Sequence, residues 1–192
     1  MKYYINILLK PNADISLNFL WGKVYQQIHI GLVEIQDENN IVPVGVSFPG
    51  YLSKGYPLGQ DLRLFAVDRE TLEKFNIKFW LKRLSNYVQI SEIMEVPTDI
   101  KTYSCFRRHQ VHTNRNRLAR RRAKRHDISI EQAMKDLESF EEKRTSTPYI
   151  HMLSQSTGDR FRIHIQRVIY NTPVSGGFNS YGLSNLSTVP NF

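Results

Sequence analysis

The sequence has little of what marks secreted and membrane-spanning proteins. It has one cysteine, Cys105, among 192 residues, so a disulfide within the chain is excluded and a reducing compartment fits. No apolar run approaches the ~20 residues that span a bilayer. The first residues lack the long apolar core and small-residue cleavage site of a signal peptide. We therefore expect a cytoplasmic globular protein that makes no use of a membrane.

Several catalytic signatures are also missing. The chain has six histidines, but none stands with cysteine at zinc-binding spacing, and no acidic cluster suits two-metal phosphoryl chemistry. A P-loop and a G-x-S-x-G motif are absent. The sequence thus predicts no metal and no cofactor. A nuclease of this composition would act on RNA, because the ribose 2′-OH can attack the neighbouring phosphate when a histidine removes its proton.

One sign of charge is missing from a long segment. Residues 101–126 contain ten Lys and Arg and neither Asp nor Glu. The rest of the chain then has 16 basic and 18 acidic residues, a net charge of −2 within a total of +8. Such concentration indicates binding of nucleic acid, because a merely soluble basic protein spreads its charge over the surface.

The stretch "RNRLARRRAKRH" holds most of this charge and predicts a helix over about 113–125. At 100° per residue, five of its basic side chains fall within an arc of about 140°, with Leu118, Ala119 and Ala123 on the other side. A disordered tail would not need this order, and a solvated helix would normally place acids at i,i+4. We interpret this segment as a nucleic-acid-binding helix, although its pattern alone does not distinguish RNA from DNA as the ligand. The basic residues in the arc are Arg117, Arg120, Arg121, Lys124 and Arg125.

The order of apolar patterns predicts an α+β protein. Runs rich in β-formers alternate with two stretches of helical spacing in the order β-α-β-β-α-β, which is the ferredoxin-like (RRM-like) arrangement. We therefore expect a ferredoxin-like domain over residues 1–97. Its strands are expected at 3–9, 42–49, 61–67 and 87–97, and its helices at 17–35, with Ser16 as N-cap, and at 68–76.

The second half predicts a divergent α+β domain over residues 98–192 that carries the arginine-rich helix. Thr113 or Asn114 is expected to cap this helix, and Ser129 begins a capping-box pattern for another helix. Gly, Ser and Asn dominate 175–185, which predicts a loop. The other expected elements are an extended segment at 100–111, a helix at 130–141 and strands at 149–153 and 160–170.

Four places in the chain offer groups for RNA chemistry, each with a plain structural alternative. His29 follows an apolar residue of the first helix and can act as a base, although a helical histidine can equally be structural. The turn "SQSTG" at 154–158 offers three hydroxyls that can bind phosphate, or it is an ordinary turn. Phe161 can stack on a base or belong to the core. Tyr181 lies in the glycine-rich loop, where the backbone can approach a ligand or simply turn.

Taken together and in order, these features resemble a known family, the CRISPR-associated endoribonucleases of subtype I-F, which cut precursor CRISPR RNA within each repeat. Each motif alone is weak, but seven in the same order over most of the chain are a strong signal. They are "YYINILLKP" at the start, "QIHIGLV" (27–33), "GVSFP" (45–49), "RHQ" (108–110), "RRRAKRHDIS" (120–129), "SQSTGDRFR" (154–162), and "GGF" with "YGLS" (176–184).

The resemblance implies a role for each matching residue in catalysis or in reading the stem. His29 matches the histidine that acts on the 2′-OH, Ser154 the serine that holds the ribose, and Tyr181 a tyrosine that orients the histidine. Arg108 and Gln110 match the pair that reads base edges at the foot of the stem.

It also implies how the RNA is held. Arg121 and Arg125 match arginines that contact phosphates and bases from the major groove. Ser156 and Thr157 match residues near the scissile phosphate, and Phe161 matches an aromatic residue that stacks on the terminal base pair.

By the same resemblance, cleavage needs no metal and leaves a 2′,3′-cyclic phosphate. The enzyme stays on its product and joins other subunits of a crRNA-guided surveillance complex in a prokaryotic cytoplasm. Two alternatives stay open: a protein of the same fold that binds the RNA hairpin without cutting it, and a DNA-binding regulator with an arginine-rich recognition helix.

Overall fold

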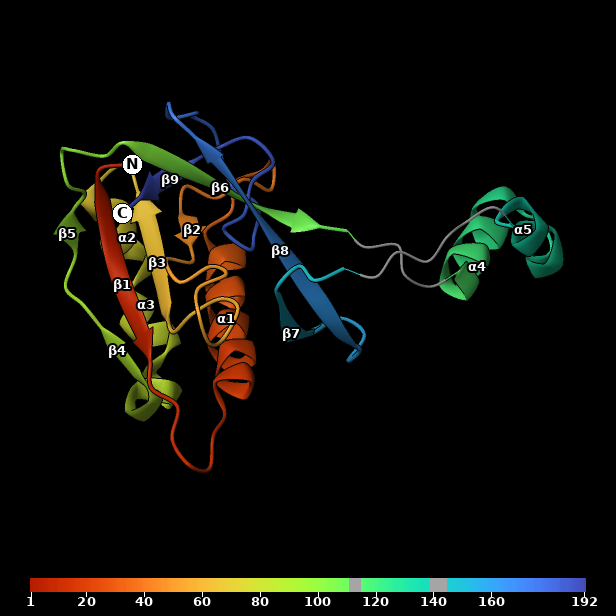
Figure 1. Cartoon of the computed structure of the whole chain (residues 1–192), viewed down its shortest axis with the longest axis horizontal. Coiled ribbons are helices and arrows are strands. Elements are labelled where there is room, and N and C mark those ends of the chain that lie inside the picture. Colours follow the sequence, from red (N-terminus) through yellow and green to blue (C-terminus); the bar gives the residue numbers. More distant parts are fainter. Residues whose placement is uncertain (111–114, 139–144) are drawn as a thin grey trace. The chain divides into compact units, whose positions relative to one another are not determined.

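The structure, a computed structural model, describes residues 1–110, 115–138 and 145–192, without the side chain of Arg117. Its contacts divide the chain into two compact units (Figure 1). The first unit comprises Met1–His109 and Pro148–Phe192, and the second comprises Gln110–Thr147. The division into domains 1–97 and 98–192 stays a prediction.

The first sheet has the ferredoxin-like strand order. Its strands are β1 (Tyr3–Leu9), β2 (Gly45–Ser47), β3 (Asp61–Ala66) and β4 (Val88–Ile90), in the order β2-β3-β1-β4, and each pair is antiparallel. Helix α1 (Leu17–Glu34) connects β1 to β2, and α2 (Arg69–Phe75) follows β3. The short strand β5 (Met94–Glu95) also pairs with β1. The predicted α+β class and ferredoxin-like order are confirmed.

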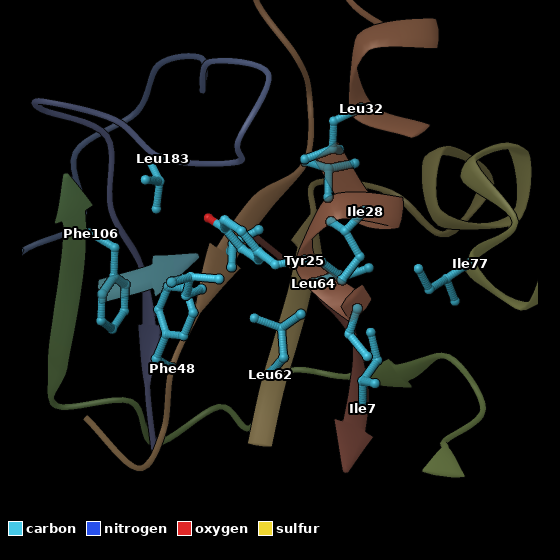
Figure 2. Packing of buried hydrophobic residues seen from close by; sticks show 14 of the residues in the cluster. Ile7, Tyr25, Ile28, Leu32, Phe48, Leu62, Leu64, Ile77, Phe106 and Leu183 are labelled. Atoms are coloured by element: carbon cyan, nitrogen blue, oxygen red, sulfur yellow. The ribbon is translucent and has the colours of Figure 1, made fainter. Parts of the chain in front are cut away.

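Helix α1 is the central packing element of the first unit. Ser16 caps it as predicted, because its side chain accepts a hydrogen bond from the Phe19 N–H. Tyr25, Ile28 and Leu32 follow at helical spacing and are buried against the sheet (Figure 2). Among the helices of the described ranges, none is both long and apolar enough to cross a membrane.

A second sheet closes the other side of the same core. Its strands are β6 (Thr102–His109), β7 (Tyr149–Leu153), β8 (Arg160–Tyr170) and β9 (Val189–Asn191), in the order β7-β8-β6-β9. Figure 2 shows Phe106 and Leu183 in one cluster with Tyr25 and Leu62. Helix α1 packs closely on β7 at Gly22, where an added Cβ would lie 2.9 Å from the His151 carbonyl oxygen.

The second unit contains two short helices, α4 (Arg115–His126) and α5 (Ile130–Asp136). Ala119 and Ala123 of α4 are buried against Ala133 of α5, so the predicted apolar side of α4 is a packing surface. Ser129 accepts a hydrogen bond from the Gln132 N–H at the start of α5, which confirms the predicted cap. The expected caps of α4, Thr113 and Asn114, lie outside the described residues.

Several predicted boundaries were wrong. The strand expected at 42–49 is limited to 45–47, since Pro43 offers no N–H and Val42 forms an isolated bridge to Phe178. The strand expected at 87–97 is split into β4 and β5. The helix expected at 130–141 ends at Asp136, and 139–141 lie outside the described residues. Three elements were not predicted: α3 (Ile77–Trp80), the 3-10 helix η1 (Lys82–Tyr87) and β9.

Candidate functional site

His29 lies half-buried on α1 with one ring nitrogen already engaged. Its Nδ1 is 2.7 Å from the carbonyl oxygen of Ser180. A carbonyl oxygen can only accept a hydrogen bond, so in this contact Nδ1 carries the proton and donates it. In the neutral imidazole Nε2 then holds the lone pair. The geometry therefore makes Nε2 the nitrogen that can accept a proton.

The ring of Tyr181 fixes the plane of the imidazole. The rings of His29 and Tyr181 are stacked, with centroids 4.0 Å apart and planes 7° from parallel. The hydroxyl of the buried Tyr25 donates a hydrogen bond of 2.8 Å to the Tyr181 carbonyl oxygen. Because Tyr25 and His29 are one helical turn apart, α1 holds the segment 180–181 at two points and so orients both rings.

Burial shifts the pKa values of His29 and Tyr181 in opposite directions. It lowers the pKa of His29, and the hydrogen bond to Ser180 offsets only part of this effect. It raises the pKa of Tyr181, and the nearby Arg108 acts weakly in the other direction. The imidazole is thus neutral down to a lower pH than an exposed histidine, and the phenol stays protonated.

Arg108 of β6 links this pair to the second sheet. Its guanidinium carbon lies 5.8 Å from the ring centroid of Tyr181 and 5.8 Å from that of Phe161. Phe161 belongs to β8, where it is opposite Met152 of β7. A chain of contacts thus joins His29, Tyr181, Arg108 and Phe161, which come from four segments far apart in the sequence.

The predicted hydroxyl cluster lies on an ordered turn between β7 and β8. The Ser154 N–H donates to the Asp159 carbonyl oxygen, and the Gly158 N–H donates to the Ser154 carbonyl oxygen, at 2.8 and 2.9 Å. Gly158 has φ of +71°, a conformation that glycine adopts without strain. The Oγ of Ser154 accepts from the Thr157 N–H and is 3.2 Å from the Oγ of Ser156. Both an ordinary turn and hydroxyls gathered at one place are therefore present.

A residue that the sequence reasoning missed connects this turn to α1. The buried Gln26 accepts, through Oε1, a hydrogen bond of 3.0 Å from the N–H of Leu153, the residue before Ser154. Gln26 precedes His29 by three residues, a rise of about 4.5 Å along the helix. Its buried Nε2 has no hydrogen-bond partner among the described residues. A single glutamine has no sequence signal for this role, since its partner is 127 residues away.

The second unit carries the remaining predicted contacts. Arg120, Arg121, Lys124 and Arg125 of α4 are exposed, and the four ion pairs found in the described parts of the chain involve none of them. Arg122, in contrast, pairs with Asp136 of α5 at 2.9 Å. Among the described residues, Arg120, Arg121, Lys124 and Arg125 therefore have no ion-pair partner.

Two further residues predicted to bind RNA are Arg117 and Gln110. Arg117 belongs to α4, but its side chain lies outside those that the structure describes. Gln110 is exposed and falls in the second unit, one residue after the end of β6.

Fold and site together define a ferredoxin-like α+β protein that holds a preoriented histidine in one unit and an arginine-rich helix in the other. A family model described as CRISPR-associated protein (Cas_Csy4) matches residues 4–192, so the chain belongs to this family. It is 32% identical over 193 residues, covering all of both chains, to proteins of Escherichia coli (strain UTI89 / UPEC) and Pseudomonas aeruginosa (strain UCBPP-PA14). Both relatives are named CRISPR-associated endonuclease Cas6/Csy4.

Solved structures give only a weak likeness. The chain aligns with one described as an RAMP protein binding different RNA substrates, with a TM-score of 0.37, 10% identity, and coverage of 98% of this chain and 99% of the other. For one described as CRISPR associated protein Cas6 the TM-score is 0.33, the identity 9%, and the coverage 99% of this chain and 98% of the other. The family assignment depends on the sequence match and not on these two.

Proposed function

We propose that the chain is an endoribonuclease that cuts precursor CRISPR RNA at the base of the repeat stem-loop. The observation that carries the proposal is His29, whose Nδ1 is committed to the Ser180 carbonyl oxygen while Nε2 is left as a proton acceptor. The endonuclease names of full-length relatives at 32% identity support the same activity. The bacterial cytoplasm as its location stays a prediction.

The proposed reaction uses the RNA's own hydroxyl as nucleophile. Nε2 of His29 takes the proton of the 2′-OH, and the resulting oxygen attacks the adjacent phosphorus. The bond from phosphorus to the 5′-oxygen of the next nucleotide breaks, and that oxygen takes a proton from water. His29 then releases its proton to solvent, which balances the reaction. The products are an upstream 2′,3′-cyclic phosphate and a downstream 5′-hydroxyl. The ring of Tyr181 keeps the imidazole in the plane that this transfer needs.

The hydroxyl turn would position the ribose and phosphate. Ser154 binds the ribose, while Ser156 and Thr157 contact RNA near the scissile phosphate; hydroxyls and backbone N–H groups suit such oxygens. Arg108 reads a base edge at the foot of the stem with Gln110, and Phe161 stacks on the terminal base pair. Holding these groups at fixed positions reduces the entropic cost of reaching the reactive geometry.

The arginine-rich helix would hold the stem. Its exposed cations match the phosphate backbone of a duplex RNA, and arginine suits bases and phosphates alike because its planar fork donates two hydrogen bonds at once. Since this grip is separate from the chemistry, the enzyme can stay on its product. Retention of the cleaved RNA would bring the protein into a surveillance complex with other subunits. The residues proposed to bind from α4 are Arg117, Arg120, Arg121, Lys124 and Arg125.

Chelation tests the proposed chemistry. We expect the cognate repeat hairpin to be cut in excess EDTA at the same rate as in Mg²⁺. The upstream product should carry a 2′,3′-cyclic phosphate, detected by mass spectrometry. Binding without any cut would favour a hairpin-binding protein of the same fold, and a cut that depends on Mg²⁺ and leaves a 3′-hydroxyl would contradict the mechanism.

Gln26 offers a test of how the hydroxyl turn is held. The Gln26→Ala variant leaves the Leu153 N–H without its acceptor, and a buried unpaired donor costs about 1–3 kcal/mol. We expect a lower free energy of unfolding by about this amount, together with slower cleavage and little change in hairpin affinity. Urea denaturation and single-turnover kinetics measure these quantities. Gln27→Ala, one position along the same helix, is the matched control, and equal effects of the two substitutions would contradict the assignment.

A further inference from the structure

Three neighbouring strands of the second sheet contain no acidic residue. Strands β6, β7 and β8 include Arg107, Arg108, Arg160, Arg162 and Arg167, with no Asp or Glu among them. Two of these arginines belong to the basic segment found in the sequence. The other three lie on β8, where the linear charge count did not reveal a basic region.

The strand register assigns these residues to two faces of the sheet. Ile150 lies opposite Ile163, and both are fully buried in the core. Side chains alternate along a strand, and residues directly opposite share a face, so the adjacent pairs project to the other side. We call this side the outer face; it is formed by Arg107, Tyr149, His151, Arg160, Arg162 and His164.

Aromatic and cationic groups are interleaved at the centre of the outer face. The guanidinium carbon of Arg162 lies 4.6 Å from the ring centroid of Tyr149. The rings of His151 and His164 lie 5.1 and 5.3 Å from the same ring. Aromatic rings and guanidinium planes are the surfaces on which single-stranded RNA stacks its bases.

Two arginines of the outer face, Arg160 and Arg162, have no ion-pair partner among the described residues. Arg162 lies directly opposite His151 on this face. Arg160 and Arg162 are exposed and take part in none of the ion pairs found in the described residues. The acid nearest in sequence, Asp159, belongs to the turn. A polyanion placed along the strands would neutralise these two cations.

The outer face begins where the proposed cleavage site ends. Leu153 and Arg160 are paired at the last position of the β7–β8 ladder, and the turn between them carries Ser154. If this turn holds the scissile phosphate, the RNA on the 5′ side of the cut is the paired stem. The strand on the 3′ side is unpaired and is the segment left to continue along β7 and β8.

We propose that the outer face binds the single-stranded RNA immediately 3′ of the cleaved phosphate, with bases on the Tyr149–Arg162 pair and phosphates on Arg160 and Arg162. The inference rests on the proposed function, because it takes the position of the cut from it. Its consequence is that the enzyme distinguishes a precursor, which has this strand, from a product, which has lost it.

A binding comparison tests the outer face. The probes are the repeat hairpin alone and the hairpin extended on its 3′ side by about ten uridines, a length within the range of one single-strand site. Both carry a 2′-deoxy nucleotide before the cut, so that neither is cleaved. We expect wild type to bind the extended RNA roughly tenfold more tightly. The Arg160→Ala/Arg162→Ala double variant should remove this gain and leave hairpin affinity unchanged. For the extended RNA, the slope of log K against log salt should flatten by about 1.4 in this variant. Each of the two phosphates that are no longer neutralised contributes ~0.7 to this slope.

Controls separate this inference from the proposed function. Lys54→Ala/Arg83→Ala removes two exposed cations from other parts of the first unit and should change neither affinity. If the all-ribose hairpin is cut but the 3′ extension adds no affinity, or if a 5′ extension gives the gain, only the outer-face proposal is wrong. If the double variant keeps its affinity for extended RNA but loses binding of an oligoglutamate peptide, an acidic protein is the occupant and the proposal is wrong. A hairpin that is neither bound nor cut overturns the proposed function itself.

Discussion

The His29→Ala variant is expected to cut the repeat hairpin about 10²–10⁴-fold more slowly than wild type, the usual contribution of a positioned acid or base. The substitution removes Nε2, the proposed proton acceptor for the 2′-OH, and leaves the turn at Ser154 and the helix α4 intact. Affinity for the hairpin should therefore stay within about twofold, since the loss falls on the transition state alone. Single-turnover kinetics with excess enzyme give the rate, and binding to a 2′-deoxy hairpin gives the affinity.

A substrate change provides the control for this result. A 2′-deoxy substitution at the nucleotide before the cut should abolish cleavage by both wild type and His29→Ala, and it should spare binding. If the variant cuts the all-ribose hairpin as fast as wild type, His29 is not the base. Cleavage that survives the 2′-deoxy substitution would exclude attack by the 2′-OH.

The pH profile gives the same prediction a second readout. The base works as the neutral imidazole, and burial lowers the pKa of His29 from its ordinary value of 6.5. The wild-type rate should therefore rise with pH and reach half of its plateau below pH 6.5. Tyr181→Ala removes the stacked ring and exposes the imidazole to water, so its midpoint should move up toward the ordinary value. A wild-type midpoint above 6.5 would contradict this environment.

Removing two arginines of α4 is expected to weaken binding of the hairpin and to leave the cleavage rate of bound RNA unchanged. The Arg121→Ala/Arg125→Ala variant should bind the hairpin roughly 10²–10⁴-fold more weakly, since hydrogen bonds to charged groups contribute about 1.5–3 kcal/mol each. The slope of log K against log salt should flatten by roughly one unit for each phosphate that the variant no longer neutralises. With enzyme in large excess over its dissociation constant, the cleavage rate of bound RNA should be preserved.

The second unit supplies a matched control for this variant. Lys135 is an exposed cation of α5 in the same unit, and Lys135→Ala should leave affinity and salt slope unchanged. Competition with duplex DNA at equal salt addresses the remaining alternative. If DNA competes as well as hairpin RNA, the helix α4 serves a DNA-binding regulator, and the assignment to repeat RNA is wrong.

The sequence was informative where short-range patterns determine structure. Ser16 and the spacing of Val24, Ile28 and Leu32 predicted α1 to within a residue, because a cap and an apolar stripe are local properties of a helix. The same reasoning predicted the ferredoxin-like order. It did not find β9, whose three residues become a strand only by pairing with β6.

The candidate site was predictable only in part, because its contacts join distant segments. His29, the turn with Ser154, and Tyr181 were candidates from their residue types, and the resemblance gave each its role. No pattern predicted that Ser180 would fix the tautomer of His29. The role of Gln26 was not predicted either, because its partner Leu153 is 127 residues away in the sequence. The charge count did not predict the outer face, because acids elsewhere in the chain outnumber the arginines of β8. Only the strand register shows that Arg160 and Arg162 lie on one face of the sheet.

The position of the second unit within the chain has an evolutionary consequence. The chain leaves the first unit after His109 and returns at Pro148, and both His109 and Tyr149 are paired with the same residue, His164. Exit and re-entry are therefore two strand spacings apart, roughly 10 Å. Residues between these points can be lengthened, shortened or exchanged while the ladder that flanks β8 is kept. Under the proposed function, the stem contacts made by α4 can thus change while the first unit keeps His29 and the base-reading Arg108.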